Sequence, residues 1–310
     1  MAGRWFAKRF PRRLPGATAA DLARMAWNPS YRAPHPSEVL DPDPFVPPGP
    51  PPMTPHEREL LDAVLADPDA DEPRLRYAAW FDRQGDERGE FIRLQIEEFH
   101  RGGRGGRREK DRVDIRFNSV FSSAPSAPSA VNRVLLLLAP WSARDVVFRR
   151  GFAEAMSLAG RAFISISDGL FRTTPLRDVR LVAVAPFLDE LARTPNLVKL
   201  ERLDLSGNWI GPTGVRELAR SPHLARLREI DLSRNGLGAD GVRELLAAPW
   251  LGQLRSLSLT DNGLTATEVD QLLAEPALAG LAHLDFSGND PGAYATEKLR
   301  DRFNSGPLLR

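Results

Sequence analysis

The chain has 310 residues, of which 42% are hydrophobic, so it is long enough for two or three domains with a buried core. Its formal net charge of +1 excludes a field of the whole molecule that would attract nucleic acid or an anionic membrane, and leaves only local patches for such partners. The absence of cysteine excludes thiol nucleophiles, disulfides and thiolate metal sites, and it fits a reducing compartment.

Neither a signal peptide nor a membrane span is expected. The N-terminal segment MAGRWFAKRFPRRLPG is basic, but prolines interrupt it, and it holds no apolar run of the length that a signal peptide needs. The longest aliphatic run, VLLLL, is far shorter than the roughly 20 residues that cross a bilayer. We therefore predict a cytoplasmic protein.

Residues 1–53 are predicted to form a basic, proline-rich, disordered tail. Prolines crowd the stretch 29–52 and cannot donate backbone hydrogen bonds, which predicts an extended spacer of polyproline II type. A ligand for the aromatic groove of a partner is the alternative interpretation. The first residues interleave cations with aromatics, which either belong to the tail or contact RNA or an acidic surface: Arg4, Trp5, Phe6, Lys8, Arg9, Phe10, Arg12 and Arg13.

A compact helical module is predicted over residues 54–100. Thr54 provides an N-cap side chain, and Glu57 provides the acid of a capping box, so the first helix begins there. A second helix is expected from Pro73, and a third after the turn at Gly85, because apolar residues recur at helical spacing in each segment.

The segment PRLRYAAWFDRQGDERGEFIRLQ within this module resembles the short repeat-companion domain found upstream of leucine-rich repeats in large bacterial protein families. The resemblance implies an architecture but no established activity. Ala79 departs from the family pattern, which has aspartate there, so the contact of that aspartate is either lost or supplied by Asp82. Four charged residues of the motif either form a ligand site or, as is commoner, lock short helices together: Arg74, Arg88, Glu90 and Arg93.

Residues 101–130 are predicted to be a flexible linker, since glycine, serine and proline dominate RGGRGGRREKDR and SVFSSAPSAPSA. The Arg-Gly triplets also resemble RNA-binding tracts, although acidic residues dilute their charge. Nucleic-acid association through the tail and this linker is therefore the alternative function.

Residues 131–310 carry repeats. An apolar, helix-like stretch over 131–150 is expected to cap the open end of the array, and two degenerate repeats follow, with helices over 161–171 and 187–193. Four full repeats then keep a period of 27 residues, each with a short strand phrase, LERLDLSGN in the first, followed by a helix in the first three. A last helix over 295–303 closes the other end. Every full phrase ends on an asparagine: Asn208, Asn235, Asn262 and Asn289.

These phrases match the consensus L-x-x-L-x-L-x-x-N and resemble leucine-rich repeats, with the long helical form of the ribonuclease-inhibitor-like subfamily. The resemblance implies an α/β solenoid, or horseshoe, with parallel strands on the concave face and helices on the convex face. The asparagines are predicted to be structural, because their amides can satisfy backbone groups that the turn leaves unpaired.

Residues between the inward leucines are predicted to face the concave side and to bind a partner. They are Asp178, Arg180, Arg202, Asp204, Glu229, Asp231, Ser256, Ser258, His283 and Asp285. The five carboxylates outnumber the two arginines, so a row of acids that repels itself favours a protein partner with basic or donor groups. Of equal weight is the interpretation that aspartate before the second leucine is repeat consensus.

Enzyme chemistry finds no support in the sequence. Gly236, Gly238 and Gly241 form a G-x-G-x-x-G, but Gly211 and Gly214 repeat the last two glycines, and Trp209 stands where Gly236 does. The five histidines are scattered without metal-ligand spacing, and the lack of cysteine excludes the thioester chemistry of leucine-rich-repeat ubiquitin ligases. We predict a monomeric, non-catalytic interaction scaffold without metal or cofactor.

Overall fold

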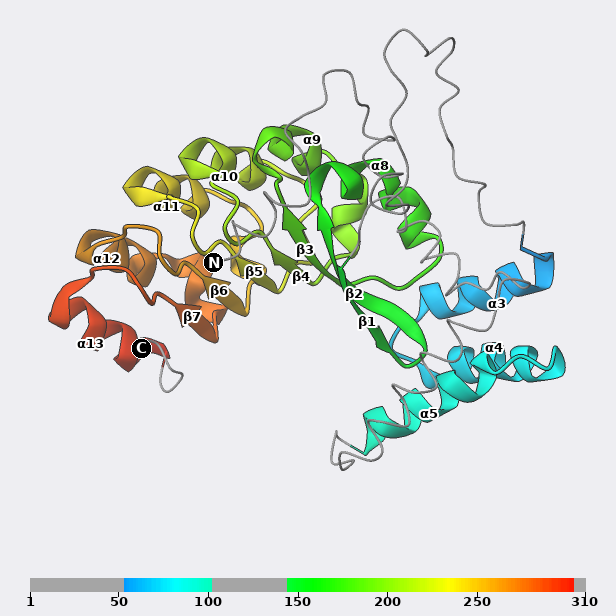
Figure 1. The fold of residues 1–310 in the computed structure, drawn as a ribbon. Coiled ribbons are helices and arrows are strands. Elements are labelled where there is room, and N and C mark those ends of the chain that lie inside the picture. The colour runs from blue at the N-terminus through cyan, green and yellow to red at the C-terminus, as the bar shows by residue number, and fades with distance from the viewer. Residues whose placement is uncertain (1–52, 102–143, 304–310) are drawn as a thin grey trace, which may run out of the picture. The chain divides into compact units, whose positions relative to one another are not determined.

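The computed structural model of the protein describes residues 53–101 and 144–303 (Figure 1). The predicted tail, most of the predicted linker and the first part of the predicted cap lie outside these residues. The division of the chain at residues 53, 100 and 130 stays a prediction, because those boundaries border or lie outside the described residues.

Three helices form the N-terminal module as the helix signals predict: α3 (Pro55–Ala66), α4 (Asp71–Arg83) and α5 (Arg88–His100). The Thr54 hydroxyl accepts a hydrogen bond from the backbone N–H of Glu57 at 3.1 Å, which caps α3. Helix α4 begins two residues before the predicted proline. The helices share a buried cluster with one residue of a later strand: Leu60, Leu61, Val64, Tyr77, Ala78, Phe81, Ile92, Ile96 and Phe152.

A β-hairpin follows, where the sequence predicted the end of a helical cap. Strand β1 (Arg144–Arg149) pairs antiparallel with β2 (Phe152–Ala159) through a two-residue turn. Both turn residues, Arg150 and Gly151, have positive φ angles of 49° and 86°, the geometry that a tight hairpin requires. The helix prediction is wrong for 144–150, because Val-Val-Phe packs better on a pleated sheet and pairs there with the otherwise free edge of β2.

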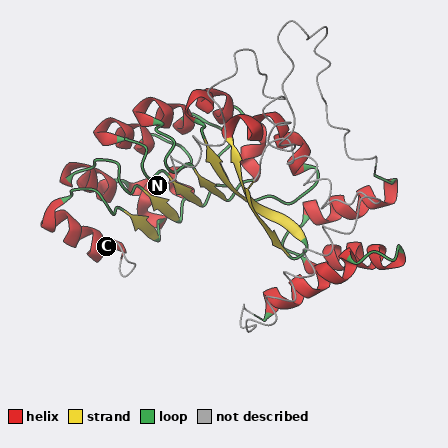
Figure 2. Cartoon of the chain, viewed as in Figure 1, coloured by secondary structure: helices red, strands yellow, loops and turns green. Residues whose placement is uncertain are grey.

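From β2 onward, helices and strands alternate, and Figure 2 shows the helices on one side of the sheet. The seven-stranded sheet follows chain order from β1 to β7, and every pair after the hairpin is parallel. The elements are α8 (Gly160–Phe171), β3 (Asp178–Val182), α9 (Leu188–Ala192), β4 (Arg202–Asp204), α10 (Gly211–Ala219), β5 (Glu229–Asp231), α11 (Gly238–Leu246), β6 (Ser256–Ser258), α12 (Ala266–Ala274), β7 (His283–Asp285) and α13 (Gly292–Phe303).

Short 3₁₀ helices flank the α-helices: η2 (Ala185–Phe187) leads into α9, and η3 (Pro195–Lys199), η4 (Leu251–Gln253) and η5 (Pro276–Gly280) lead toward the next strands. The repeated proline tripeptides lie at or beside three of these segments, as expected of punctuating residues.

One continuous hydrophobic core runs through the repeats. Leu203, Ile230, Leu257 and Leu284 lie in register at the centres of β4 to β7 and are all buried. Helix α13 covers the last layer with buried Ala295, Leu299 and Phe303, so the predicted closing helix is present. The predicted α/β solenoid with parallel strands is confirmed.

Candidate binding surface on the strands

The strands align the predicted surface residues in two rows. The first row, in register from β3 to β7, is Asp178, Arg202, Glu229, Ser256 and His283, and the second is Arg180, Asp204, Asp231, Ser258 and Asp285. The predicted residues on β3 to β6 line a groove of about 560 Å³, whereas the two on β7 lie outside its lining. Adjacent members of a row are about one strand spacing, roughly 5 Å, apart across the sheet.

Arginines neutralise the N-terminal half of this surface. Arg202 contacts Asp178 at 2.7 Å and Glu229 at 3.4 Å, and Arg180 contacts Asp204 at 3.4 Å. The hydrogen bond to Asp178 raises the pKa of the Arg202 guanidinium. The expected row of self-repelling acids is therefore wrong for β3 and β4, because cations from neighbouring strands alternate with the carboxylates.

A further arginine, which the sequence did not indicate, comes from the hairpin. Arg149 on β1 contacts the carboxylate of Asp178 at 3.0 Å, although the two are 29 residues apart. Its position depends on the antiparallel pairing of β1, and no local pattern in the sequence predicts that pairing.

The C-terminal half keeps its negative charge. Asp231 and Asp285 make no ion pair with any described residue. One oxygen of each accepts a backbone hydrogen bond two residues on, from Ser233 at 2.8 Å and from Ser287 at 3.0 Å. Asp204 makes the same contact with Ser206 at 2.8 Å. Each aspartate thus has a local role in its turn, as the consensus interpretation requires, while its second carboxylate oxygen makes no such turn contact.

The asparagines form a hydrogen-bonded ladder through the adjacent loops. The side-chain oxygen of each of the last three accepts from the backbone N–H of the asparagine one repeat earlier: Asn235 from Asn208 (2.9 Å), Asn262 from Asn235 (3.0 Å) and Asn289 from Asn262 (2.9 Å). Their amides donate to inward leucines: Leu205 (3.0 Å), Leu232 (2.9 Å) and Leu259 (2.9 Å). The first three asparagines are buried and the last is half-buried, so the ladder holds each loop to its neighbour.

The glycine motif has a structural explanation. Gly236 and Gly238 have positive φ angles of 63° and 53°, and a Cβ on Gly241 would lie 2.7 Å from the side chain of Leu237. The sheet also keeps chain order throughout the described strands, so it has no reversal of strand order at which a dinucleotide would bind.

Charged residues of the N-terminal motif pair within the protein. Arg74 is fully buried, contacts Glu154 of β2 at 2.7 Å and donates to the carbonyl of Arg150 at 3.0 Å. Arg88 pairs with Asp86 through its side chain, and Arg93 pairs with Asp82. The pair of Arg93 with Asp82 fits the interpretation that Asp82 replaces the aspartate missing at position 79. Together, these ion pairs fit a network of charges that holds helices and strands together.

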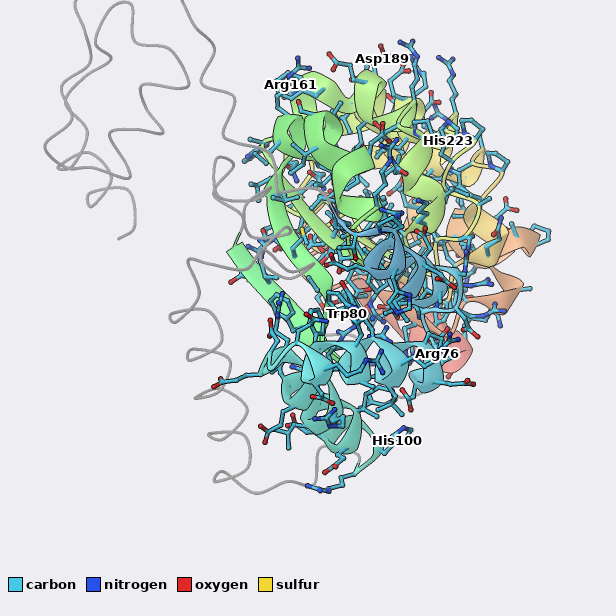
Figure 3. All side chains as sticks on the ribbon, turned by 90° about the vertical axis from the view of Figure 1, so that its right-hand side faces the viewer. Arg76, Trp80, His100, Arg161, Asp189 and His223 are labelled. Atoms are coloured by element: carbon cyan, nitrogen blue, oxygen red, sulfur yellow. The ribbon has the colours of Figure 1, made fainter. Side chains whose placement is uncertain are left out.

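No group of three or more potential metal-ligating side chains occurs among residues 53–101 and 144–303. Figure 3 shows two of the histidines, His100 on α5 and His223 after α10, on well separated elements. Likewise, no helix in the described part of the chain is long and apolar enough to cross a membrane.

Two consecutive repeats, residues 196–219 and 223–246, match the family model described as Leucine Rich repeat. The chain contains leucine-rich repeats. Among solved structures, it is similar to a chain of the "Crystal structure of Rad7 and Elc1 complex in yeast", at 21% identity and a TM-score of 0.35. The match covers 49% of this chain and 41% of the solved chain, which is less than half of either. No curated protein matches the chain.

Proposed function

We propose that this protein is a non-catalytic scaffold that binds a protein partner on the strand face of its leucine-rich repeats. The partner offers arginine, lysine or other donor groups to the C-terminal half of the surface. The support comes from the repeats themselves, which present a continuous, solvent-facing row of side chains on a rigid core. A cytoplasmic location and a monomeric state remain predictions.

Asp231 carries this proposal. It lines the groove, it makes no ion pair with a described residue, and its turn hydrogen bond to Ser233 fixes the side chain in place. A carboxylate held in one orientation before binding loses little conformational freedom on binding. Asp285 repeats the arrangement one strand beyond Ser258. A cationic segment lying along β5 to β7 would meet both carboxylates in sequence.

The test separates the charge of Asp231 from its role in the turn. Asp231→Asn keeps a side-chain oxygen for the Ser233 N–H but removes the negative charge, so folding is expected to survive. Asp240→Asn, on the exposed side of α11, is the matched control, since it removes the same charge away from the strands. The probe is an octapeptide of alternating arginine and serine, with glutamate replacing arginine in a second peptide.

We expect the arginine peptide to bind the full chain at low ionic strength and Asp231→Asn to weaken it by about 3-fold to 10-fold, while Asp240→Asn leaves the affinity unchanged. Binding is also expected to weaken as salt rises, because the charges are exposed. Equal affinity for the arginine and glutamate peptides, or no effect of Asp231→Asn, would place the interaction elsewhere.

A further inference from the structure

Trp209 is the most exposed large hydrophobic residue among those described. The residue lies in the loop between β4 and α10, and 82% of its surface is exposed. By contrast, Trp250 is buried, and its indole N–H donates to the carbonyl of Leu218 at 3.1 Å. Burial in the core therefore does not explain the tryptophan at position 209.

The backbone at Trp209 makes its presence more unusual. Its φ angle of 56° lies in the left-handed region, which costs an L residue free energy that glycine does not lose. The next two repeats place glycine at this position, Gly236 with φ 63° and Gly263 with φ 69°. A strained residue held in a fixed structure is a reason to look for a function of its side chain.

The loop holds the indole in a defined position. On one side of Trp209, Asn208 donates from its backbone to Asn235 at 2.9 Å and from its amide to Leu181 at 2.7 Å. On the other side, Ile210 is buried in the core. Because both flanking residues are anchored, the loop needs little ordering when a ligand contacts the indole.

The surroundings of Trp209 are open, and within residues 53–101 and 144–303 no arginine or lysine lies over its ring. A Cβ placed on Gly236 or Gly263 would meet no atom within 4 Å, so the same edge of the next two repeats is uncovered. The arginine of this edge, Arg234, contacts Asp261 at 3.5 Å and is thereby neutralised. Asp231, on the strand of the following repeat, is a carboxylate that makes no ion pair with a described residue.

We propose that Trp209 is an anchor for an arginine or lysine side chain of the basic partner segment that lies on the strand face. This inference rests on the proposed function and adds the recognition element at its edge. An exposed indole face attracts a cation, and tryptophan is enriched among residues that dominate interfaces. Trp209 follows Asp204 by five residues, and Asp231 is the register partner of Asp204 one strand spacing, roughly 5 Å, away. The Cα atoms of Trp209 and Asp231 are therefore at most roughly 23 Å apart, within the roughly 26 Å that an extended octapeptide spans.

Trp209→Gly is the decisive variant, because it gives the loop the residue that the next two repeats use. We expect its melting temperature to equal or exceed that of the unchanged protein, since the left-handed strain is relieved. We also expect its affinity for the arginine-serine octapeptide to fall about 2-fold to 5-fold, the loss of one exposed cation–π contact. If Trp209 had a purely structural role, Trp209→Gly would lower the stability of the protein and leave its affinity for the peptide unchanged.

Two further measurements define the contact. Trp209→Tyr keeps an aromatic face and is expected to retain more affinity than Trp209→Leu, which keeps only apolar volume. In nuclear magnetic resonance spectra of the nitrogen-labelled full chain, the indole N–H signal of Trp209 is the one that is absent from the spectrum of Trp209→Gly. We expect this signal to shift when the arginine peptide is added and to stay unchanged when the glutamate peptide is added. Unchanged affinity of Trp209→Gly, or a shift of that signal by the glutamate peptide, overturns the proposal.

The outcome also distinguishes this inference from the proposed function. If Asp231→Asn weakens binding and Trp209→Gly does not, the strand face binds the peptide without the anchor. If only Trp209→Gly weakens binding, the anchor stands and the strand-face site fails. If neither variant loses affinity for the arginine peptide, both the proposed function and this inference are refuted.

Discussion

Replacing Asn235 by alanine tests the asparagine ladder directly. The side-chain oxygen of Asn235 accepts from the N–H of Asn208 at 2.9 Å, and its amide donates to the carbonyl of Leu205 at 3.0 Å. That carbonyl still receives the amide of Asn208 at 2.8 Å, so the main loss is the buried N–H. An unpaired buried donor costs about 1 to 3 kcal/mol.

For a folded part of this size, about 1 kcal/mol lowers the melting temperature by roughly 2 to 4 °C. Asn235→Ala is therefore expected to melt roughly 2 to 12 °C lower, measured by far-ultraviolet circular dichroism and by denaturant unfolding with an unchanged slope. Asn289→Ala is expected to cost less, because that side chain is half-buried and water can reach its partners. Arg243→Ala, in an exposed pair, is the control with no expected change. An unchanged melting temperature for Asn235→Ala, or an equal loss for Asn289→Ala, refutes the reasoning.

Arg74→Met is expected to destabilise the protein by about 3 to 5 kcal/mol in chemical unfolding, because it leaves the buried carboxylate of Glu154 without its closest cation. Burial by itself would raise the pKa of Asp86, but hydrogen bonds from its arginine neighbour hold that pKa below its ordinary value. Its contribution to stability is thus present above about pH 4 and is lost as pH falls, so Asp86→Asn and the unchanged protein should converge in stability in acid. The alternative function predicts an RNA gel shift that weakens steeply with salt and disappears on deletion of residues 1–16 and 101–112, and no shift at low salt excludes it.

The sequence alone determined the repeat architecture. The 27-residue period, the inward leucines and the asparagine that closes each phrase are local features, and each specifies a strand, a turn and a helix by itself. Because each repeat contacts mainly its neighbours, stacking identical local units leaves little freedom in topology. For the same reason, alternation along each strand placed all ten predicted surface residues in two aligned rows.

The helical module was also predictable in its elements, since Thr54 and Glu57 mark a helix start whatever the surroundings. The contacts that attach this module to the strands could not be predicted from the sequence. The sequence motif contains Arg74 and Gln95, but only the structure shows that Arg74 donates to the backbone of Arg150 and that Gln95 accepts from Gly151 at 2.6 Å. These contacts join residues more than 50 positions apart, and no periodic pattern encodes them.

The charge of the surface was decided by tertiary structure. In the sequence, carboxylates outnumber arginines on the strand face, yet Arg149 reaches Asp178 only because β1 folds back on β2. The exposure of Trp209 depends equally on the buried residues that fix its loop. Secondary structure follows from hydrogen bonds and side-chain periodicity within a few residues, whereas the pairing of charges follows from distances of a few ångströms that only the folded chain establishes.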